Sequence, residues 1–241
     1  MSVYLFFPAY NEEKGIEKAL TDAHNTLKQA NIDHTLVVVD DGSKDKTAEI
    51  LNRLNLPLKI VTHHQNKGLG AALRTGIETI VPMTKPGDII VTRESDTTQS
   101  AQVILELINA VKEGADFSIA SALHPEGFKN VPYHRQLLSH GGNLVYKVLF
   151  PIPNLNSYTN LSRAFKAELL QKALNTYQND LITSDGFEGV AELVLKLRKF
   201  NPRAKEVPVV IDFSTLQRPS SMRVVKTILN SLKLCFSQLG R

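Results

Sequence analysis

Short runs of β-branched and aromatic residues alternate with longer amphipathic stretches over the first half of the chain. The apolar runs predict five strands, at Val3–Phe7, Thr35–Val39, Leu58–Val61, Ile89–Thr92 and Phe117–Ala120. The amphipathic stretches predict the helices between them, at Ile16–Ala30, Thr47–Leu54, Gly70–Ile80 and Ala101–Glu113. This alternation is typical of an α/β fold with a parallel sheet covered by helices. Ligands of such sheets bind at the carboxyl ends of the strands, so we expect the chemistry in the loops that follow them.

The second half of the chain has a less regular pattern. It predicts helices at Gln136–Phe150 and Phe187–Lys199 and a strand at Val207–Phe213. No internal repeat, low-complexity tract or linker divides the chain, so we expect a single domain over residues 1–241.

The last segment, residues 222–239, is predicted to be an amphipathic helix. One face of it carries Val225, Ile228, Leu229, Leu232, Phe236 and Leu239, with Arg223, Lys226 and Lys233 nearby. Two interpretations stay open: the apolar face closes the core of the domain, or it rests on a membrane interface.

Composition and charge narrow the classes of function. With 28 Lys and Arg against 24 Asp and Glu, the net charge of +4 suits mild attraction to phosphates or to an anionic membrane, but is too small to indicate nucleic-acid binding. The single cysteine, Cys235, excludes an intramolecular disulfide and a Cys-rich metal site and fits a cytoplasmic setting. No stretch reaches the roughly 18 to 20 apolar residues that span a bilayer. We therefore expect a protein that is soluble or peripheral at the cytoplasmic face of a membrane.

Polar loops follow the first two predicted strands. Pro8 ends the first strand and presents Tyr10 and Glu12 at the edge of the sheet, where they either hold a nucleobase or form a loop and helix cap. After the second strand, Asp40 and Asp41 precede a glycine that permits a sharp turn. These carboxylates either bind a base or ribose or cap the turn.

The loop after the third strand, residues 65–76, is rich in glycine. Gly68 and its neighbours permit close approach of the backbone, and the helix that follows can face a diphosphate with its N-terminus. The loop lacks both the ATPase phosphate-binding pattern and the dinucleotide fingerprint, so alone it is a weak phosphate signal. His63 and His64 point to opposite faces of a strand, so we expect surface histidines and no metal site there.

The three loops together resemble glycosyltransferase family 2, particularly dolichol-phosphate mannose synthases and other polyprenyl-phosphate glycosyltransferases. The resemblance covers residues 5–77 and rests on the segments 8–12, 38–43 and 66–77, in this order and at these separations. It implies a GT-A fold, which is a Rossmann-like nucleotide-sugar-binding fold with a mostly parallel central sheet. The donor contacts that it implies are Pro8, Tyr10, Glu12, Asp40, Asp41, Lys67, Gly68, Arg74, Glu94, Ser95, Asp96, Ser139 and Arg218.

The resemblance also implies a metal site. The family carries an Asp-any-Asp motif after its next strand, and this chain has Glu94 and Asp96 there. Glutamate is also a hard oxygen ligand, although its extra methylene moves the carboxylate outward by about a bond length. We therefore expect Mg²⁺ or Mn²⁺ at Glu94 and Asp96, where it neutralises charge on the leaving nucleoside diphosphate. In the alternative interpretation, the two acids merely begin a loop.

On the acceptor side the likeness is weaker. Residues 133–139 resemble the family's basic segment, in which Arg135 and Ser139 face the acceptor phosphate and the donor sugar. The planar guanidinium binds phosphate oxygens in pairs, although Arg135 is equally well a solvated helix charge. The family's arginine after the fifth strand is absent from Ala120 to Ala122. Arg218 lies where a loop usually closes over the diphosphate, or is a surface residue.

These features predict an inverting hexosyltransferase that moves mannose or glucose from a GDP- or UDP-sugar to a polyprenyl or dolichyl phosphate. Asp96 and Arg135 are the expected catalytic residues, with Glu192 or Asp185 as the base should the acceptor be a hydroxyl. Two alternatives remain. One is a glycosyltransferase with a non-lipid acceptor, and the other is a catalytically silent nucleotide-sugar-binding protein, which Glu94 in place of aspartate motivates.

Overall fold

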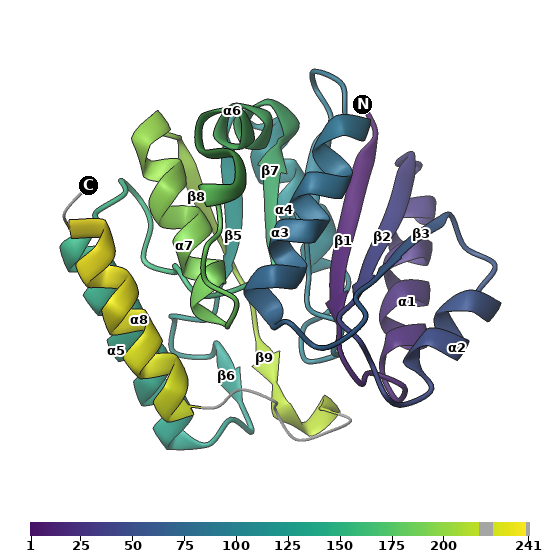
Figure 1. Ribbon diagram of the computed structural model, residues 1–241, viewed down its shortest axis with the longest axis horizontal. Coiled ribbons are helices and arrows are strands. Elements are labelled where there is room, and N and C mark those ends of the chain that lie inside the picture. Colours follow the sequence, from purple (N-terminus) through teal and green to yellow (C-terminus); the bar gives the residue numbers. More distant parts are fainter. Residues whose placement is uncertain (217–223, 240–241) are drawn as a thin grey trace.

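A seven-stranded sheet forms the centre of the protein in a computed structural model that describes residues 1–216 and 224–239 (Figure 1). Its strand order is β3-β2-β1-β4-β7-β5-β8, and every neighbouring pair is parallel except the two made by β7. The bounds are Val3–Ala9 for β1, His34–Asp40 for β2, Leu58–Thr62 for β3, Ile89–Thr92 for β4, Phe117–Ser121 for β5, Arg163–Lys166 for β7 and Ala204–Pro208 for β8. The expected α/β fold with a mostly parallel sheet is confirmed.

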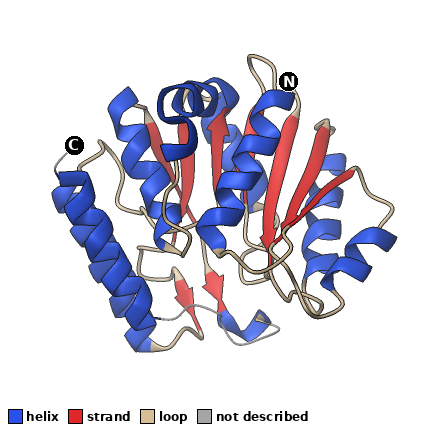
Figure 2. Cartoon of the chain, viewed as in Figure 1, coloured by secondary structure: helices blue, strands red, loops and turns tan. Residues whose placement is uncertain are grey.

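Helices cover both faces of this sheet (Figure 2). The helices are α1 Ile16–Gln29, α2 Thr47–Arg53, α3 Leu69–Ile80, α4 Val103–Lys112, α5 Tyr133–Leu149, α6 Ala167–Tyr177, α7 Glu188–Leu197 and α8 Val224–Leu239. Successive strand residues point to opposite faces, so Phe6 packs under α3 while Leu5 and Phe7 join the core formed with α1 and α4. Burial on both faces explains why the strands read as continuous apolar runs.

The sequence analysis missed the two-residue strand β6 (Phe128–Lys129), the strand β7 and the helix α6. The strand β7 is only four residues long and begins and ends with Arg163 and Lys166, so its composition hides it. The helix α6 had a readable signal, since Leu169, Leu170 and Ala173 share a buried side.

The strand predicted at Val207–Phe213 is wrong in its bounds. The chain leaves the main sheet after Pro208, and Ile211–Asp212 then forms β9, which pairs in parallel with β6 at Phe128–Lys129. A short 3₁₀ helix, Phe213–Thr215, follows β9.

The order of the strands places the polar loops side by side. The strand β1 lies between β2 and β4, with Ala9 paired to Asp40 and Phe6 paired to Thr92. Because the three strands are parallel, the loops that follow them leave the sheet at the same edge. Within the described residues, no helix has the length and apolarity needed to cross a bilayer.

Candidate active site

The loops after β1 and β2 are joined by backbone hydrogen bonds. The N–H of Asp41 donates to the carbonyl of Ala9 at 2.8 Å, and the N–H of Glu12 donates to Thr47 Oγ1 at 2.8 Å. Asn11 adopts a left-handed conformation with φ of 54°, which asparagine tolerates well. The joined loops hold Tyr10 and Glu12 at the carboxyl edge of the sheet, where both side chains are partly exposed.

Asp40 and Asp41 are both buried and both bind protein groups. Asp40 is 1% exposed, and its Oδ1 accepts a hydrogen bond from the N–H of Ser43 at 3.0 Å. Asp41 accepts hydrogen bonds from the N–H groups of Lys67 at 2.9 Å and Gly68 at 2.8 Å. The sequence left two interpretations of these carboxylates, a base or ribose contact and a turn cap. Asp40 acts as the turn cap. Asp41 holds the next loop in place.

The N-terminus of α3 is filled by the protein itself. Gly68 has φ of 103°, and a Cβ there would lie 2.2 Å from the carbonyl oxygen of Asp185. The N–H of Gly70 donates to that same carbonyl at 2.8 Å. The glycines therefore admit the segment around Asp185, and the Asp41 carboxylate takes the anion position at the start of the helix. The sequence-based expectation that this helix end faces a diphosphate is corrected.

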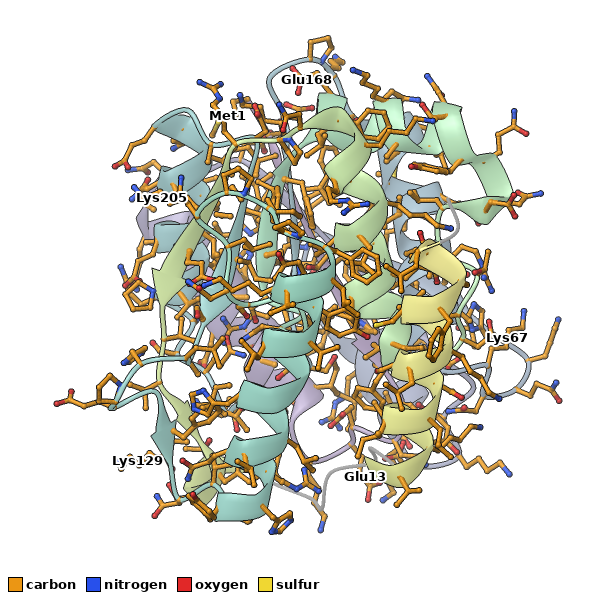
Figure 3. The ribbon with its side chains drawn as sticks, turned by 90° about the vertical axis from the view of Figure 1, so that its left-hand side faces the viewer. Met1, Glu13, Lys67, Lys129, Glu168 and Lys205 are labelled. Carbon is orange, nitrogen blue, oxygen red and sulfur yellow. The ribbon has the colours of Figure 1, made fainter. Side chains whose placement is uncertain are left out.

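The two basic residues of this loop also differ from expectation. Arg74 Nη1 donates to the carbonyl of Ile182 at 2.6 Å, and its Nη2 lies 3.1 Å from Asp185 Oδ1. The side chain of Lys67 is exposed and lies at the outer edge of the molecule in Figure 3. Arg74 thus fixes the segment that precedes α7. The contact that Lys67 makes in the site is its backbone N–H, which donates to Asp41.

His63 is buried, so its assignment as a surface residue is wrong. It is 7% exposed, with Nδ1 2.6 Å from Asp41 Oδ1 and Nε2 3.0 Å from Thr75 Oγ1. The pairing of β2 with β3 brings His63 next to Asp41, a contact that sequence spacing alone does not reveal. His64 is exposed, as expected.

The loop after β4 comprises residues 93–99 and lies against the end of β1; we call it the metal loop after the site that the sequence predicts there. The N–H of Arg93 donates to the carbonyl of Phe6 at 2.9 Å, and Ser95 Oγ donates to the carbonyl of Pro8 at 2.5 Å. Ser95, an expected donor contact, is thus committed to the β1 loop. The buried guanidinium of Arg93 donates to the carbonyls of Gln99 and Ser100, which fixes the far end of the loop.

The metal loop contains two acids, Glu94 and Asp96, and one cation, the buried Arg93. Burial raises the pKa of the Glu94 carboxyl to about 8, and the charges of Asp96 and Glu12 add to this effect while Arg93 opposes it. Asp96 Oδ1 accepts hydrogen bonds from Thr98 N and Thr98 Oγ1 at 3.1 and 2.8 Å. The Asp96 side chain also lines a surface hollow of about 450 Å³, so solvent reaches it.

These carboxylates fit a hard divalent cation, because such an ion prefers oxygen ligands and would offset both the burial of the Glu94 carboxylate and its repulsion by Asp96. Nowhere in residues 1–216 and 224–239 do three or more His, Cys, Asp or Glu side chains form a cluster able to hold a metal ion. The protein therefore offers two carboxylates, and the remaining ligands would come from diphosphate oxygens and water.

Glu192 does not fit the general base predicted for it. Its side chain is 0% exposed, and its oxygens accept hydrogen bonds from Thr183 N, Thr183 Oγ1 and Ser184 N. Burial alone raises the pKa of Glu192, but these bonds and Lys196, 3.0 Å away, bring that pKa below its usual range. Glu192 is therefore an anchor for residues 183–184. Asp185, the other candidate base, is 66% exposed and paired with Arg74.

Arg135 lies in the first turn of α5 with its guanidinium carbon 5.7 Å from the ring centroid of Phe213. No carboxylate within the described residues forms an ion pair with it. A half-buried guanidinium that faces a ring and lacks an anion is suited to bind a phosphate. Ser139 lies one turn further along α5 and is partly exposed. Arg218 lies outside the described residues.

Comparison with solved structures shows the fold. Glucosyl-3-phosphoglycerate synthase of Mycobacterium tuberculosis, crystallised with Mn²⁺, UDP and glucosyl-3-phosphoglycerate, superposes with a TM-score of 0.72 at 18% identity. The match covers 99% of this chain and 80% of that one. The protein therefore has the GT-A fold that the sequence led us to expect.

Comparison with known sequences shows the family. The dolichol-phosphate mannosyltransferase of Pyrococcus furiosus is 29% identical over 238 residues, which cover 97% of this chain and 62% of that relative, so the chain spans less than two thirds of it. The UDP-N-acetylglucosamine–dolichyl-phosphate N-acetylglucosaminyltransferase of Methanococcus voltae is 30% identical over 227 residues, 86% of this chain and 84% of that protein. The sequence profile of glycosyl transferase family 2 matches residues 4–172, and the chain belongs to this family.

Proposed function

We propose that this protein is an inverting, metal-dependent hexosyltransferase that moves mannose or glucose from a GDP- or UDP-sugar to a polyprenyl or dolichyl phosphate. One observation carries the proposal. The loops after β1 and β4 converge so that Asp96 and Glu12 both lie within electrostatic reach of Glu94, and burial together with their negative charge raises the pKa of Glu94 to about 8. Such a site suits a divalent ion that grips a diphosphate.

On the donor side, Glu94 and Asp96 would hold Mg²⁺ or Mn²⁺, which stabilises the departing nucleoside diphosphate by neutralising its charge. Pro8, Tyr10 and Glu12 border the nucleoside at the carboxyl edge of the sheet. The backbone N–H of Arg93 and the hydroxyl of Ser95 fix the metal loop against β1, which would hold the two carboxylates in place beside the nucleoside. Positioning of this kind lowers the barrier because the reacting groups are held before the reaction starts.

On the acceptor side, a lipid phosphate needs no protein base, because it is ionised near neutral pH. This suits the site, since Glu192 is buried and fully hydrogen-bonded. Arg135 binds the phosphate oxygens and directs one of them at the anomeric carbon. That oxygen forms the new bond on the face opposite the diphosphate while the bond to the diphosphate breaks, so the configuration at the anomeric carbon inverts.

The surface around α5 and α8 supports a lipid acceptor. The two helices pack against each other and lie side by side in Figures 1 and 3. Exposed apolar side chains along them form what we call the α5–α8 face, which comprises Tyr133, Leu137, Leu144, Val145, Val148, Leu149, Val225, Ile228, Leu229, Leu232, Phe236 and Leu239. Exposed apolar groups of this number mark a surface that binds lipid or protein.

Charge favours a lipid surface among these partners. Neither α5 nor α8 contains Asp or Glu, whereas Lys147, Lys226 and Lys233 are exposed on them. Basic residues beside an apolar face suit the anionic headgroups of a membrane. We therefore propose peripheral contact with the cytoplasmic face of a membrane. Arg135 begins α5, so this contact would bring a lipid phosphate beside it.

The two interpretations of the last helix each describe part of it. Leu234 and Cys235 of α8 are buried in the core with Tyr146 of α5. The apolar side chains read from the sequence as one stripe, such as Leu229 and Phe236, remain 55% and 75% exposed. The helix therefore closes the core with one side and offers another to the proposed membrane.

Transfer of radiolabel tests this function. The protein is incubated with Mn²⁺ and either GDP-[¹⁴C]mannose or UDP-[¹⁴C]glucose, with polyprenyl phosphate in anionic vesicles or with soluble phosphate acceptors. We expect labelled product in the organic phase. Label that enters only a soluble acceptor would replace the lipid with a soluble substrate, and donor binding without any turnover would favour the silent nucleotide-sugar-binding protein.

A further inference from the structure

The metal loop is tied to a segment from the far end of the chain by paired hydrogen bonds. Thr97 Oγ1 donates to the carbonyl of Thr215 at 2.8 Å. Thr215 Oγ1 lies 2.9 Å from the carbonyl oxygen of Thr97 and 2.8 Å from that of Asp212, so its one proton is shared between these two acceptors. The N–H of Asp212 donates to the carbonyl of Thr98 at 2.9 Å. Both threonine hydroxyls thus lie within hydrogen-bond distance of the other residue's carbonyl, and Asp212 of β9 continues the contact.

The same segment carries the ring that faces Arg135. Phe213 stands between Asp212 and Thr215 in the chain, and its ring centroid lies 5.7 Å from the guanidinium carbon of Arg135. The segment has its own support, because Asp212 accepts hydrogen bonds from Asn130 Nδ2 and Ser214 N at 2.9 Å each. The segment therefore contacts the metal loop through Asp212 and Thr215, and it contacts Arg135 through Phe213, which lies between them in the chain.

We infer that Thr97 and Thr215 are positioning residues that lock the metal loop to the Phe213–Arg135 contact and so hold the donor and acceptor sites at a fixed separation. This inference rests on the proposed function, in which Asp96 lies on the donor side and Arg135 on the acceptor side. In-line displacement requires the two sites at one spacing, and a small misplacement is costly in rate. The hydroxyls themselves touch neither substrate.

The test uses substitutions that keep shape and remove the hydroxyl, Thr97→Val and Thr215→Val, with Thr215→Ser as the variant that keeps it. Thr176→Val is the matched control, because Thr176 is also an exposed threonine whose Oγ1 donates to a backbone carbonyl. Calorimetry measures the affinity of each whole protein for Mn²⁺ with UDP and with GDP. The transfer assay measures the acceptor KM, and thermal unfolding measures Tm.

We expect each valine variant to bind Mn²⁺ with nucleotide about fivefold more weakly, the effect of losing one ordinary hydrogen bond. The acceptor KM should rise in the same variants, although neither threonine contacts the acceptor. Thr215→Ser should restore both quantities, and Thr176→Val should change neither. The effects of Thr97→Val and Thr215→Val should not add in the double variant, since the two residues form one contact.

Wild-type affinity and acceptor KM in both valine variants would overturn the inference. The inference would also be overturned if Thr215→Ser did not restore the affinity and the acceptor KM, or if the loss of affinity followed only from a fall in Tm. Failure of the wild-type protein to bind Mn²⁺ with either nucleotide would overturn the proposed function together with this inference. Normal binding in the wild type with unchanged binding in the variants would overturn only the inference.

Discussion

The Oδ2 atom of Asp41 accepts a hydrogen bond from the backbone N–H of Gly68 at 2.8 Å. This contact places a carboxylate of the protein where a glycine-rich loop before a helix usually receives a phosphate. The loop after β3 is therefore part of the framework of the proposed site, whose chemistry we place at the ends of β1 and β4.

Replacing Asp41 should cost stability without costing nucleotide affinity. In Asp41→Asn, one carboxylate oxygen becomes an NH₂ group and the N–H that it accepted from loses its acceptor, so we expect a loss of about 1–3 kcal/mol in the free energy of unfolding. Urea unfolding measures this loss, with Asp22→Asn as the control, because Asp22 makes an exposed ion pair with Lys18. If Mn²⁺ with UDP or GDP binds far more weakly in a folded Asp41→Asn protein, Asp41 contacts the ligand and the framework role is wrong.

Removing a carboxylate from the metal loop should abolish turnover. For Asp96→Asn we expect a fall in transfer rate of about 100-fold or more, because charge on the departing diphosphate is no longer neutralised. Tm should stay close to that of the wild type, since Asp96 is partly exposed. Glu94→Asp should retain activity, because it preserves the charge and shortens the side chain by one methylene. Full activity in Asp96→Asn would refute the metal assignment.

Glu192 should make stability depend on pH. Its pKa in the folded protein lies below the ordinary value near 4.5, so its stabilising effect is present above that value and is lost as pH falls through the folded pKa. Glu192→Gln should lower the free energy of unfolding at pH 7 by about 3 kcal/mol, since it leaves Lys196 buried and unpaired.

The difference between Glu192→Gln and the wild type should shrink in acid. Urea unfolding at pH 7 and at successively lower pH measures it, with Glu49→Gln on α2 as a control at the surface. An equal difference at every pH would show that the Glu192 carboxylate charge contributes nothing to stability.

Apolar residues of the α5–α8 face should set membrane affinity. Leu229→Ser and Phe236→Ser should each weaken sedimentation with anionic vesicles by about tenfold, the effect of losing one buried apolar side chain. Val210→Ser is the matched control, because Val210 is 45% exposed and belongs to neither helix. Added salt should weaken binding further, since the lysines attract anionic headgroups. Equal binding of all three variants would assign the face to another partner.

Local pattern was enough to predict much of the fold and part of the site. The strands that lead to Tyr10, Asp40 and Glu94 are continuous apolar runs, and each is followed by polar residues that mark its exit. Glu94 and Asp96 are two positions apart, so their shared loop is a property of the chain itself. Hydrophobic periodicity and short spacings are local, and the sequence by itself determined these features.

Partners distant in the chain were decided only by the tertiary structure. Asp41 meets Gly68, and Arg74 meets the carbonyl of Ile182, because the order of the strands and the packing of distant segments bring these groups together. Arg163 is fully buried in β7, where it donates to the carbonyls of Val190 and Tyr158 and burial lowers its pKa to about 9.

A charged residue in a short run is typical of a surface, so the composition of β7 gave no sign that it enters the sheet between β4 and β5. The same charge is tolerated inside the protein because carbonyl groups far along the chain accept its hydrogen bonds. Spacing along the chain determines which residues share the loop at the end of each strand. The hydrogen-bond partner of each buried polar group depends instead on how distant segments pack, and local sequence patterns carry no information about that packing.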